Sequence, residues 1–156
     1  MKVLLAVDGS AFGEEAAREV ARRPWPVGSE VKVISVIEPS YVPAAEPWGL
    51  PENYFAELEK LAAEKAHSAV EGALKILRER DDTAMKFTSD TPRGLVKQTI
   101  LDEAERWGAD LIVVGSHGYG FWNRLLLGSV SQGIASVAPC SVEIVKSHAS
   151  AGVEKV

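Results

Sequence analysis

The segment "DLIVVG" (110–115) carries the strongest indication of the fold. It is a short run of apolar, partly β-branched residues, which is typical of a strand buried on both faces. The residues "SHGYGFWNRLLLGS" (116–129) follow it directly, and two of their three glycines, Gly118 and Gly128, stand at defined spacing from Gly115 before a helical pattern begins. A buried strand that leads into a glycine-rich loop and a helix predicts one unit of a parallel α/β sheet.

Four other segments also have the pattern of strands. They are "KVLLAVD" (2–8), "EVKVISVIE" (30–38), "TAMKFTS" (83–89) and "SVEIVK" (141–146). Helical patterns lie between them, so strands and helices alternate along the whole chain. Parallel strands require such crossovers, which are almost always right-handed. The sequence therefore predicts a doubly wound, Rossmann-like α/β fold with helices on both faces of the sheet.

The helices are predicted from apolar spacing and from their end signals. The longest covers 52–80, and Thr91 with Pro92 is predicted to begin the next helix as N-cap and first helical residue. Gly108 suits the end of that helix. The apolar face expected for the long helix consists of Phe55, Leu58, Leu61, Ala62, Ala66, Ala69, Ala73, Leu74 and Leu77.

Composition limits the classes of function. The chain of 156 residues is 46% hydrophobic and 25% charged, with a formal net charge of -5 and no run of three basic residues. This argues against a nucleic-acid binder, which needs a basic footprint. No apolar run approaches the ~20 residues of a membrane span, so a cytoplasmic protein is predicted. We expect one domain over 1–147 and a disordered tail over 148–156.

Cysteine content excludes two kinds of stabilisation. Cys140 is the only cysteine, so neither an intrachain disulfide nor a cysteine-based metal cluster can form. We interpret Cys140 as a small buried residue.

The loop after 110–115 has the features of an anion site. Gly115 and Gly118 are expected to turn sharply with positive φ and to let a ligand approach the backbone. Gly128 and Ser129 open a helix whose first amides lack partners and can bind an anion. Arg124 could add charge. The pattern is neither a P-loop, which needs a following Gly-Lys-Ser/Thr, nor the dinucleotide fingerprint, which would follow the first strand.

The G-x-x-G-x9-G-S spacing resembles the universal stress protein family in its ATP-binding branch. Further similar segments are "VDGS" (7–10), "SVIE" (35–38), "GADLIVVGSHG" (108–118), "LLLGSVS" (125–131) and "APCSVEIV" (138–145). The resemblance covers nearly the whole chain in the right order. It implies a five-stranded parallel sheet of order 3-2-1-4-5 and an ATP held mainly by backbone groups.

The resemblance also implies roles for individual residues. Asp8 is expected to bond the ribose, and the main chain of Val36 to meet the adenine. Gly115 and Gly118 are expected along the ribose and phosphates, with Gly128, Ser129 and Val130 at the phosphates. The complete ATP set is Val7, Asp8, Val36, Val114, Gly115, Gly118, Arg124, Gly128, Ser129 and Val130.

Two positions depart from the family pattern. Asp90 stands where the family usually has glycine, and a local adjustment is expected because aspartate tolerates the left-handed region. Glu143 places a charge in the last strand. Asp8 and Asp90 also allow comparison with receiver domains, but Asp90 falls in the predicted turn and Lys146 is weak support for that reading.

Two polar residues have alternative roles. Asp8 could cap the helix that follows it, or hold a sugar hydroxyl or Mg²⁺, and the loop context favours a ligand. His117 could act as an acid or base beside phosphates. No carboxylate is evidently placed to orient it, so we do not interpret it as catalytic.

The function predicted is a cytoplasmic ATP-binding protein that uses nucleotide occupancy as a signal, without efficient catalysis. A slow ATPase and a nucleotide-free interaction module of the same fold are the alternatives. A homodimer is expected along 141–146, because the last strand of this order lies at a sheet edge. Glu143 in that strand could face solvent, pair with the partner's Lys146, or block the edge.

Overall fold

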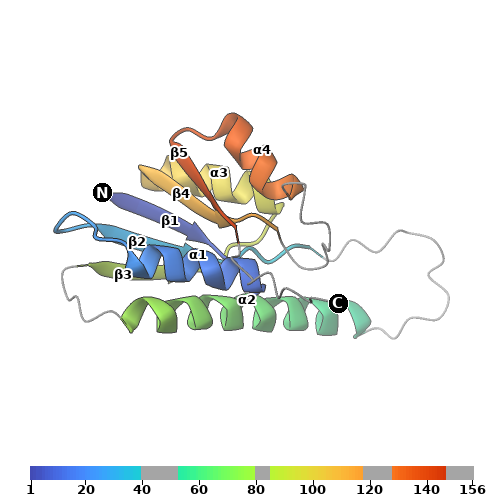
Figure 1. Cartoon of the computed structure of the whole chain (residues 1–156). Helices are drawn as coiled ribbons and strands as arrows, with labels where there is room; N and C mark the ends of the chain where they lie inside the picture. Colours follow the sequence, from blue (N-terminus) through green and yellow to red (C-terminus); the bar gives the residue numbers. More distant parts are fainter. Residues whose placement is uncertain (40–52, 80–84, 118–127, 147–156) are drawn as a thin grey trace, which may run out of the picture.

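A computed structural model describes residues 1–39, 53–79, 85–117 and 128–146. Its strands are β1 (Lys2–Ala6), β2 (Glu30–Ile34), β3 (Lys86–Asp90), β4 (Leu111–Gly115) and β5 (Ser141–Val145). Its helices are α1 (Ala11–Arg22), α2 (Tyr54–Arg78), α3 (Val96–Trp107) and α4 (Ser129–Val137). The strands form one parallel sheet of order β3-β2-β1-β4-β5 (Figure 1). This confirms the predicted fold and strand order.

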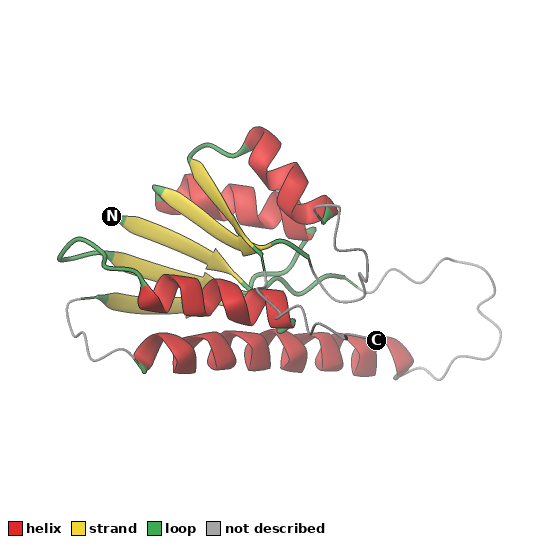
Figure 2. Ribbon diagram, in the orientation of Figure 1, coloured by secondary structure: helices red, strands yellow, loops and turns green. Residues whose placement is uncertain are grey.

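The sheet is covered on both faces, as Figure 2 shows. Successive residues of β1 point to opposite sides, as the pleat requires. Val3 and Leu5 join the core formed with α1 and α2, whereas Leu4 joins the core formed with α3 and α4. All three side chains are fully buried. The two-sided burial explains why "KVLLA" and "LIVVG" read as continuous apolar runs rather than as alternating ones.

The chain leaves β2 earlier than predicted, and α3 begins later. β2 ends at Ile34, but the amide of Ile37 donates to the carbonyl of Pro92 at 2.8 Å, and the amide of Gly94 donates to the carbonyl of Ile37 at 3.1 Å. Residues 92–94 are therefore held in extended pairing and cannot form the first turn of a helix. α3 starts at Val96 with no side-chain cap, so the predicted N-cap at Thr91 was wrong.

Asp90 is the last residue of β3, in register with Ile34 of β2. Its carbonyl accepts from the amide of Ser35 at 3.3 Å, and its side chain accepts from the amide of Thr91 at 2.8 Å. The prediction that Asp90 falls in the turn was therefore wrong: it is a strand residue whose side chain also fixes the turn after it.

Helix α2 contacts the sheet over part of its length only. Five residues of the predicted face are buried, and so is Val70, which was not predicted; the five are Ala66, Ala69, Ala73, Leu74 and Leu77. Phe55 and Leu61 are 47% and 60% exposed, so the predicted apolar face was wrong for these two positions. The reason is geometric: the N-terminal turns of α2 extend past the carboxyl ends of the strands (Figure 1).

Three further predictions concern the rest of the chain. Cys140 is half-buried against the α3 and α4 core, and burial raises the pKa of its thiol. Within the described ranges, no helix is long and apolar enough to cross a membrane. The predicted tail over 148–156 lies outside the described residues.

Candidate functional site

A cavity of about 470 Å³ opens at the carboxyl ends of β1, β2 and β4. Strand order reverses between β1 and β4, and ligands of doubly wound sheets bind at that point. Its volume lies in the range common for small-molecule sites. Of the predicted ATP residues, those that line it are Val7, Asp8, Val36, Val114, Gly115, Gly128, Ser129 and Val130. Gly118 and Arg124 lie outside the described residues.

Other residues line this cavity although they were not predicted to bind ligand. Glu38 after β2 and Lys65 of α2 contribute charged side chains, and Ser35 and Ser131 contribute hydroxyls. A second hollow, of about 680 Å³, runs along the outer side of α2. All its described lining residues come from α2 and its C-cap, whereas several described elements enclose the first cavity. The first cavity is therefore the candidate site.

Asp8 and Ser10 close the N-terminus of α1 beside the cavity. The Oδ1 atom of Asp8 accepts from the amide and the hydroxyl of Ser10, at 3.0 and 2.6 Å. The hydroxyl oxygen of Ser10 in turn accepts from the amide of Gly13 at 3.2 Å. Asp8 thus supports the cap through Ser10, while the hydrogen bonds described for its carboxylate leave Oδ2 for a ligand. Capping and ligand binding are compatible here.

The N-terminus of α4 is built differently. Gly128 is the N-cap, and no described side chain caps this end of the helix. The first intrahelical bond runs from the amide of Gln132 to the carbonyl of Gly128, at 3.0 Å. The amides of Ser129, Val130 and Ser131 precede that bond, so they lack an intrahelical acceptor. They give the cavity wall a set of donors at the positive end of a helix dipole.

Ser116 joins the end of β4 to the start of α4. Its carbonyl accepts from the amide of Gly128 at 2.8 Å and from the hydroxyl of Ser131 at 3.1 Å. Its amide donates to the carbonyl of Val145, at the end of β5, at 2.8 Å. Ser116 and Ser131 are 1% and 2% exposed. Sequence reasoning missed Ser131, although it is the last letter of the quoted segment "LLLGSVS".

The two described glycines of the loop, Gly115 and Gly128, lie where another part of the chain comes very close. Gly115 is the last residue of β4 and is not one of the glycines with positive φ, so that prediction was wrong. A Cβ there would lie 2.7 Å from the carbonyl carbon of Phe12 in α1. At Gly128, which has φ of -61°, a Cβ would lie 3.0 Å from the carbonyl oxygen of Ser116. Both glycines permit close packing of chain on chain.

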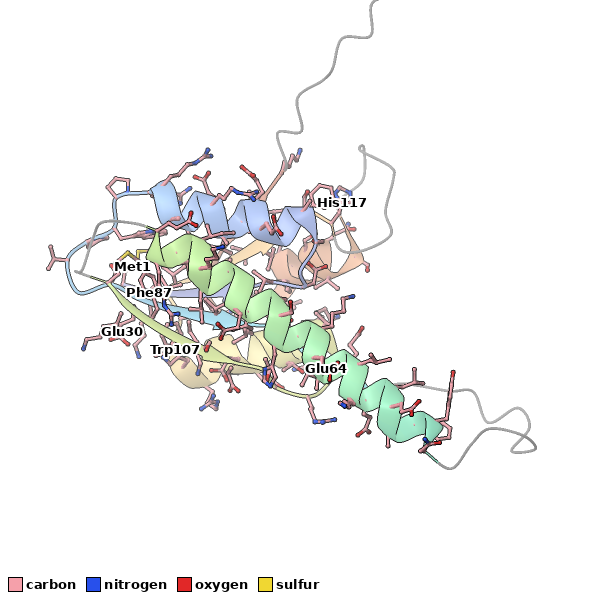
Figure 3. All side chains as sticks on the ribbon, turned by 90° about the horizontal axis from the view of Figure 1, so that it is seen from below. Met1, Glu30, Glu64, Phe87, Trp107 and His117 are labelled. Atoms are coloured by element: carbon pink, nitrogen blue, oxygen red, sulfur yellow. The ribbon has the colours of Figure 1, made fainter. Side chains whose placement is uncertain are left out.

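His117 also lies at the cavity, at the end of the molecule opposite Met1 and Trp107 (Figure 3). Its ring centroid is 5.1 Å from that of Phe12, and its Nδ1 is 3.1 Å from the hydroxyl of Ser116. Among the described residues, no group of three His, Cys, Asp or Glu side chains could hold a metal ion on its own. The arrangement can bind and orient an anionic ligand through backbone donors.

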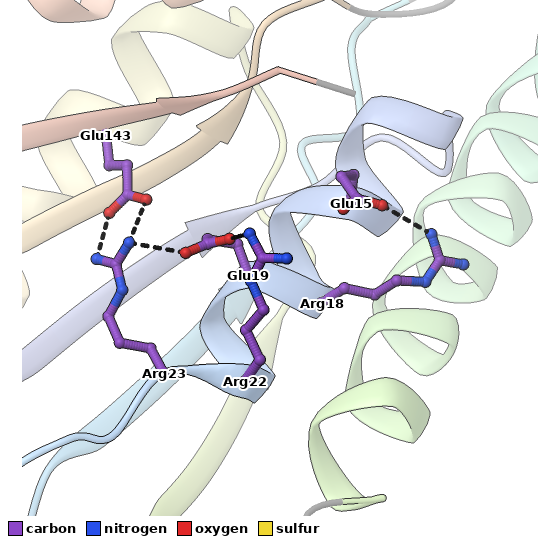
Figure 4. Close-up of polar contacts among 6 residues, drawn as sticks. All are labelled: Glu15, Arg18, Glu19, Arg22, Arg23 and Glu143. Carbon is purple, nitrogen blue, oxygen red and sulfur yellow. Dashed lines mark hydrogen bonds and ion pairs between the residues drawn. The ribbon is translucent and has the colours of Figure 1, made fainter. Parts of the chain in front are cut away.

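Glu143 points to α1 and forms an ion pair within the chain. Its two carboxylate oxygens accept from Arg23 at 2.6 and 2.7 Å, and Arg23 also donates to Glu19 at 2.9 Å (Figure 4). The hydrogen bond that Arg23 donates to Glu143, followed by the one it donates to Glu19, raises the pKa of Arg23. Val142 and Ile144 pack on the opposite face. None of the three predicted roles for Glu143 included Arg23.

Comparison with known proteins decides the family. The profile described as "Universal stress protein family" matches residues 1–146. The chain belongs to the universal stress protein family. A universal stress protein of Thermus aquaticus is 31% identical over 144 residues, which cover 92% of this chain and 97% of that relative.

Two solved structures of similar fold extend the comparison. One is of a hypothetical protein, MJ0577, with a TM-score of 0.79 and 27% identity, covering 96% of this universal stress protein and 97% of that chain. The other is a universal stress protein family protein of Arabidopsis thaliana with AMP bound. Its TM-score is 0.67 at 19% identity, with 96% and 93% of the two chains covered, so it shows likeness of fold.

Proposed function

We propose that this universal stress protein binds ATP at the carboxyl edge of its sheet and signals through nucleotide occupancy. The observation that carries the proposal is the uncapped start of α4 at the cavity wall. Free helix amides with the positive dipole end form a ready site for phosphate groups. The AMP held by the Arabidopsis relative supports an adenine nucleotide as the ligand class.

The remaining residues fit the parts of such a nucleotide. Gly128, Ser129 and Val130 would hold the phosphates, Asp8 the ribose through Oδ2, and the main chain of Val36 the adenine. Val7, Val114 and Gly115 would line the path between base and phosphates. We keep Gly118 and Arg124 in the proposed site from the sequence alone.

Mg²⁺ would accompany the phosphates and neutralise part of their charge. Asp8 is the residue we assign to it as an alternative to the ribose, because magnesium takes carboxylate and phosphate oxygens together. The Oδ1 atom is held by Ser10, so only Oδ2 would serve the metal directly.

Turnover of the bound nucleotide should be very slow. A general base normally contributes ~10²–10⁴-fold and needs a partner that orients it. The Nδ1 atom of His117 contacts the hydroxyl of Ser116 at 3.1 Å, and the sequence next to this histidine offers no carboxylate. The slow ATPase is therefore kept as the second candidate.

Nucleotide extraction from freshly purified protein, followed by calorimetric titration, tests the proposal. We expect bound adenine nucleotide in the extract and saturable binding of ATP by the emptied protein. Failure to bind ATP, ADP or AMP would instead favour the nucleotide-free interaction module. Phosphate release on the order of 1 s⁻¹, a rate common among enzymes, that is lost in His117→Ala would favour the ATPase.

We also propose a homodimer along β5. Among the described residues this strand pairs only with β4, and two-fold pairing with a second copy would satisfy the groups along its other edge. The ion pair with Arg23 engages the carboxylate of Glu143, which reduces repulsion between two copies. Light scattering should give the mass of a dimer. A monomer that becomes dimeric in Glu143→Val would show that Glu143 blocks the edge.

A further inference from the structure

The hydroxyl of Ser131 is the feature from which the inference starts. It lies in the first turn of α4, is almost fully buried, and has two carbonyl oxygens within hydrogen-bond distance. The carbonyl of Gly128 is at 2.9 Å and that of Ser116 is at 3.1 Å. Serine has one hydroxyl proton, so the two carbonyls share it or alternate as acceptor.

A local helix bond alone would not give Ser131 any special role. Serine often bonds a carbonyl of the preceding turn, and Ser136 of the same helix does so, with the carbonyl of Gln132 at 2.9 Å. The difference is the second acceptor. Ser131 reaches 15 residues back along the chain to Ser116, whereas the acceptor of Ser136 lies within its own helix, on the exposed side.

Ser116 is a fixed anchor. It is buried, and its amide is bonded to Val145 at the end of β5. Its carbonyl has two lone pairs and accepts from both the amide of Gly128 and the hydroxyl of Ser131. These two attachments lie on either side of the open amides of Ser129 and Val130. One attachment would let the first turn pivot, and the second fixes its direction relative to the sheet.

We infer that Ser131 is a positioning residue, which holds the open amides of α4 in the geometry that a phosphate chain requires. This inference rests on the proposed function and deepens it. It assigns the orientation of the phosphate-binding amides to one side chain, that of Ser131, which is bonded to the carbonyl of Ser116. Preorganised donors bind an anion more tightly than donors that must first be ordered. The effect of Ser131 should therefore fall on the phosphates and not on the base or ribose.

Calorimetric titration of Ser131→Ala with ATP and with adenosine tests the inference. Loss of one neutral hydrogen bond predicts a roughly five- to tenfold weaker affinity for ATP. Adenosine carries no phosphate, so its affinity should stay within about twofold of the wild type. Ser136→Ala is the matched control and should bind both ligands as the wild type does. Ser131→Thr, which keeps the hydroxyl, should recover most of the affinity for ATP.

Each outcome has one meaning. Equal ATP affinity in folded Ser131→Ala and in the wild type would overturn the inference and leave the proposed function standing. A parallel loss of ATP and adenosine would show a general structural role and would also overturn it. If Ser131→Ala fails to fold, Ser131→Cys keeps the volume with a weaker donor and must show the same selective loss. Absence of ATP binding in the wild type would remove the proposed function and this inference together.

Discussion

Helices α1 and α4 begin at the same cavity, but among the described residues only α1 has a side-chain cap at its N-terminus. At α1, Ser10 accepts from the amide of Gly13, and Asp8 holds Ser10 in place. At α4, glycine stands in the capping position and no described side chain caps the helix. A capped helix N-terminus contributes the hydrogen bonds of its cap to folding stability. An uncapped N-terminus leaves its amide donors available to a ligand. The contrast separates residues that stabilise a helix from residues proposed to bind a ligand.

Placing a negative charge at the uncapped N-terminus of α4 should have the largest effect of the changes considered. In Ser129→Asp, a carboxylate stands at the first position of α4, where the dipole favours it by ~0.3–1 kcal/mol. The same negative charge repels phosphates. Two like unit charges about 4 Å apart near a protein surface repel each other by roughly 4 kcal/mol. We expect affinity for ATP, measured by calorimetry, to fall at least about 100-fold.

The neutral variant Ser129→Asn is the control for this prediction. It has a similar shape without the charge, so it should retain far more affinity than Ser129→Asp. The melting temperature of Ser129→Asp should not fall. An affinity for ATP unchanged in Ser129→Asp would place the phosphates away from α4.

Glu103 extends the comparison to carboxylates. Both of its carboxylate oxygens accept hydrogen bonds from side chains of the same protein, so it resembles the capped start of α1. Oε1 accepts from Lys32 at 2.5 Å, Oε2 accepts from Arg106, and the side chain is 7% exposed. Burial acts to raise the pKa of Glu103, but the hydrogen bonds and charges of Lys32 and Arg106 lower it overall. Removing one partner of a buried pair is costly, so Glu103→Gln should lose about 2 kcal/mol of unfolding free energy.

The pH dependence gives this second prediction its sign. A lowered pKa in the folded state means that the contribution of Glu103 is complete above the unfolded pKa of ~4.3 and is lost as pH falls through the folded value. Urea unfolding should therefore show the largest gap between wild type and Glu103→Gln near neutral pH, narrowing below about pH 4. If the difference in unfolding free energy between the wild type and Glu103→Gln did not depend on pH, the loss would come from packing of this side chain and not from its charge. Affinity for ATP near neutral pH should stay the same.

Removing the side-chain cap of α1 should have the smallest effect. Ser10→Ala removes the cap of α1 and should cost about 1 kcal/mol of unfolding free energy. Ser129→Ala, at the start of α4, removes no cap and should stay within ~0.5 kcal/mol of the wild type. Equal losses in chemical denaturation of these two variants would erase the distinction between the helix starts.

Most of the fold was accessible from the sequence because two-sided burial leaves a local pattern. "DLIVVG" (110–115) predicted β4 to within one residue. The start of α3 was not accessible, since Thr91 and Pro92 carry good local signals that pairing with Ile37 overrides. The exposure of Phe55 was equally hidden, because the spacing of apolar residues does not reveal where the sheet ends.

The site was predicted in part for the same reason. Asp8 and Gly128 stand next to elements that the sequence identifies, and both line the cavity. The contact of Ser131 with Ser116 and that of Glu143 with Arg23 join residues distant in the chain. No local pattern specifies such pairs. Glycine spacing pointed to Gly115 and Gly128, which line the cavity, but Gly115 lacks the positive φ predicted for it.

The tight approach of Phe12 to Gly115 affects how the glycine signature should be read in other chains of this fold. A side chain at Gly115 would force the backbone of α1 outward, with or without nucleotide. A descendant that had abandoned nucleotides would thus still be under selection to keep this glycine, merely to assemble. Its Ser129, which is not a cap, would be free to drift. After nucleotide binding is lost, substitutions would therefore accumulate at the start of α4 well before they appeared at the end of β4.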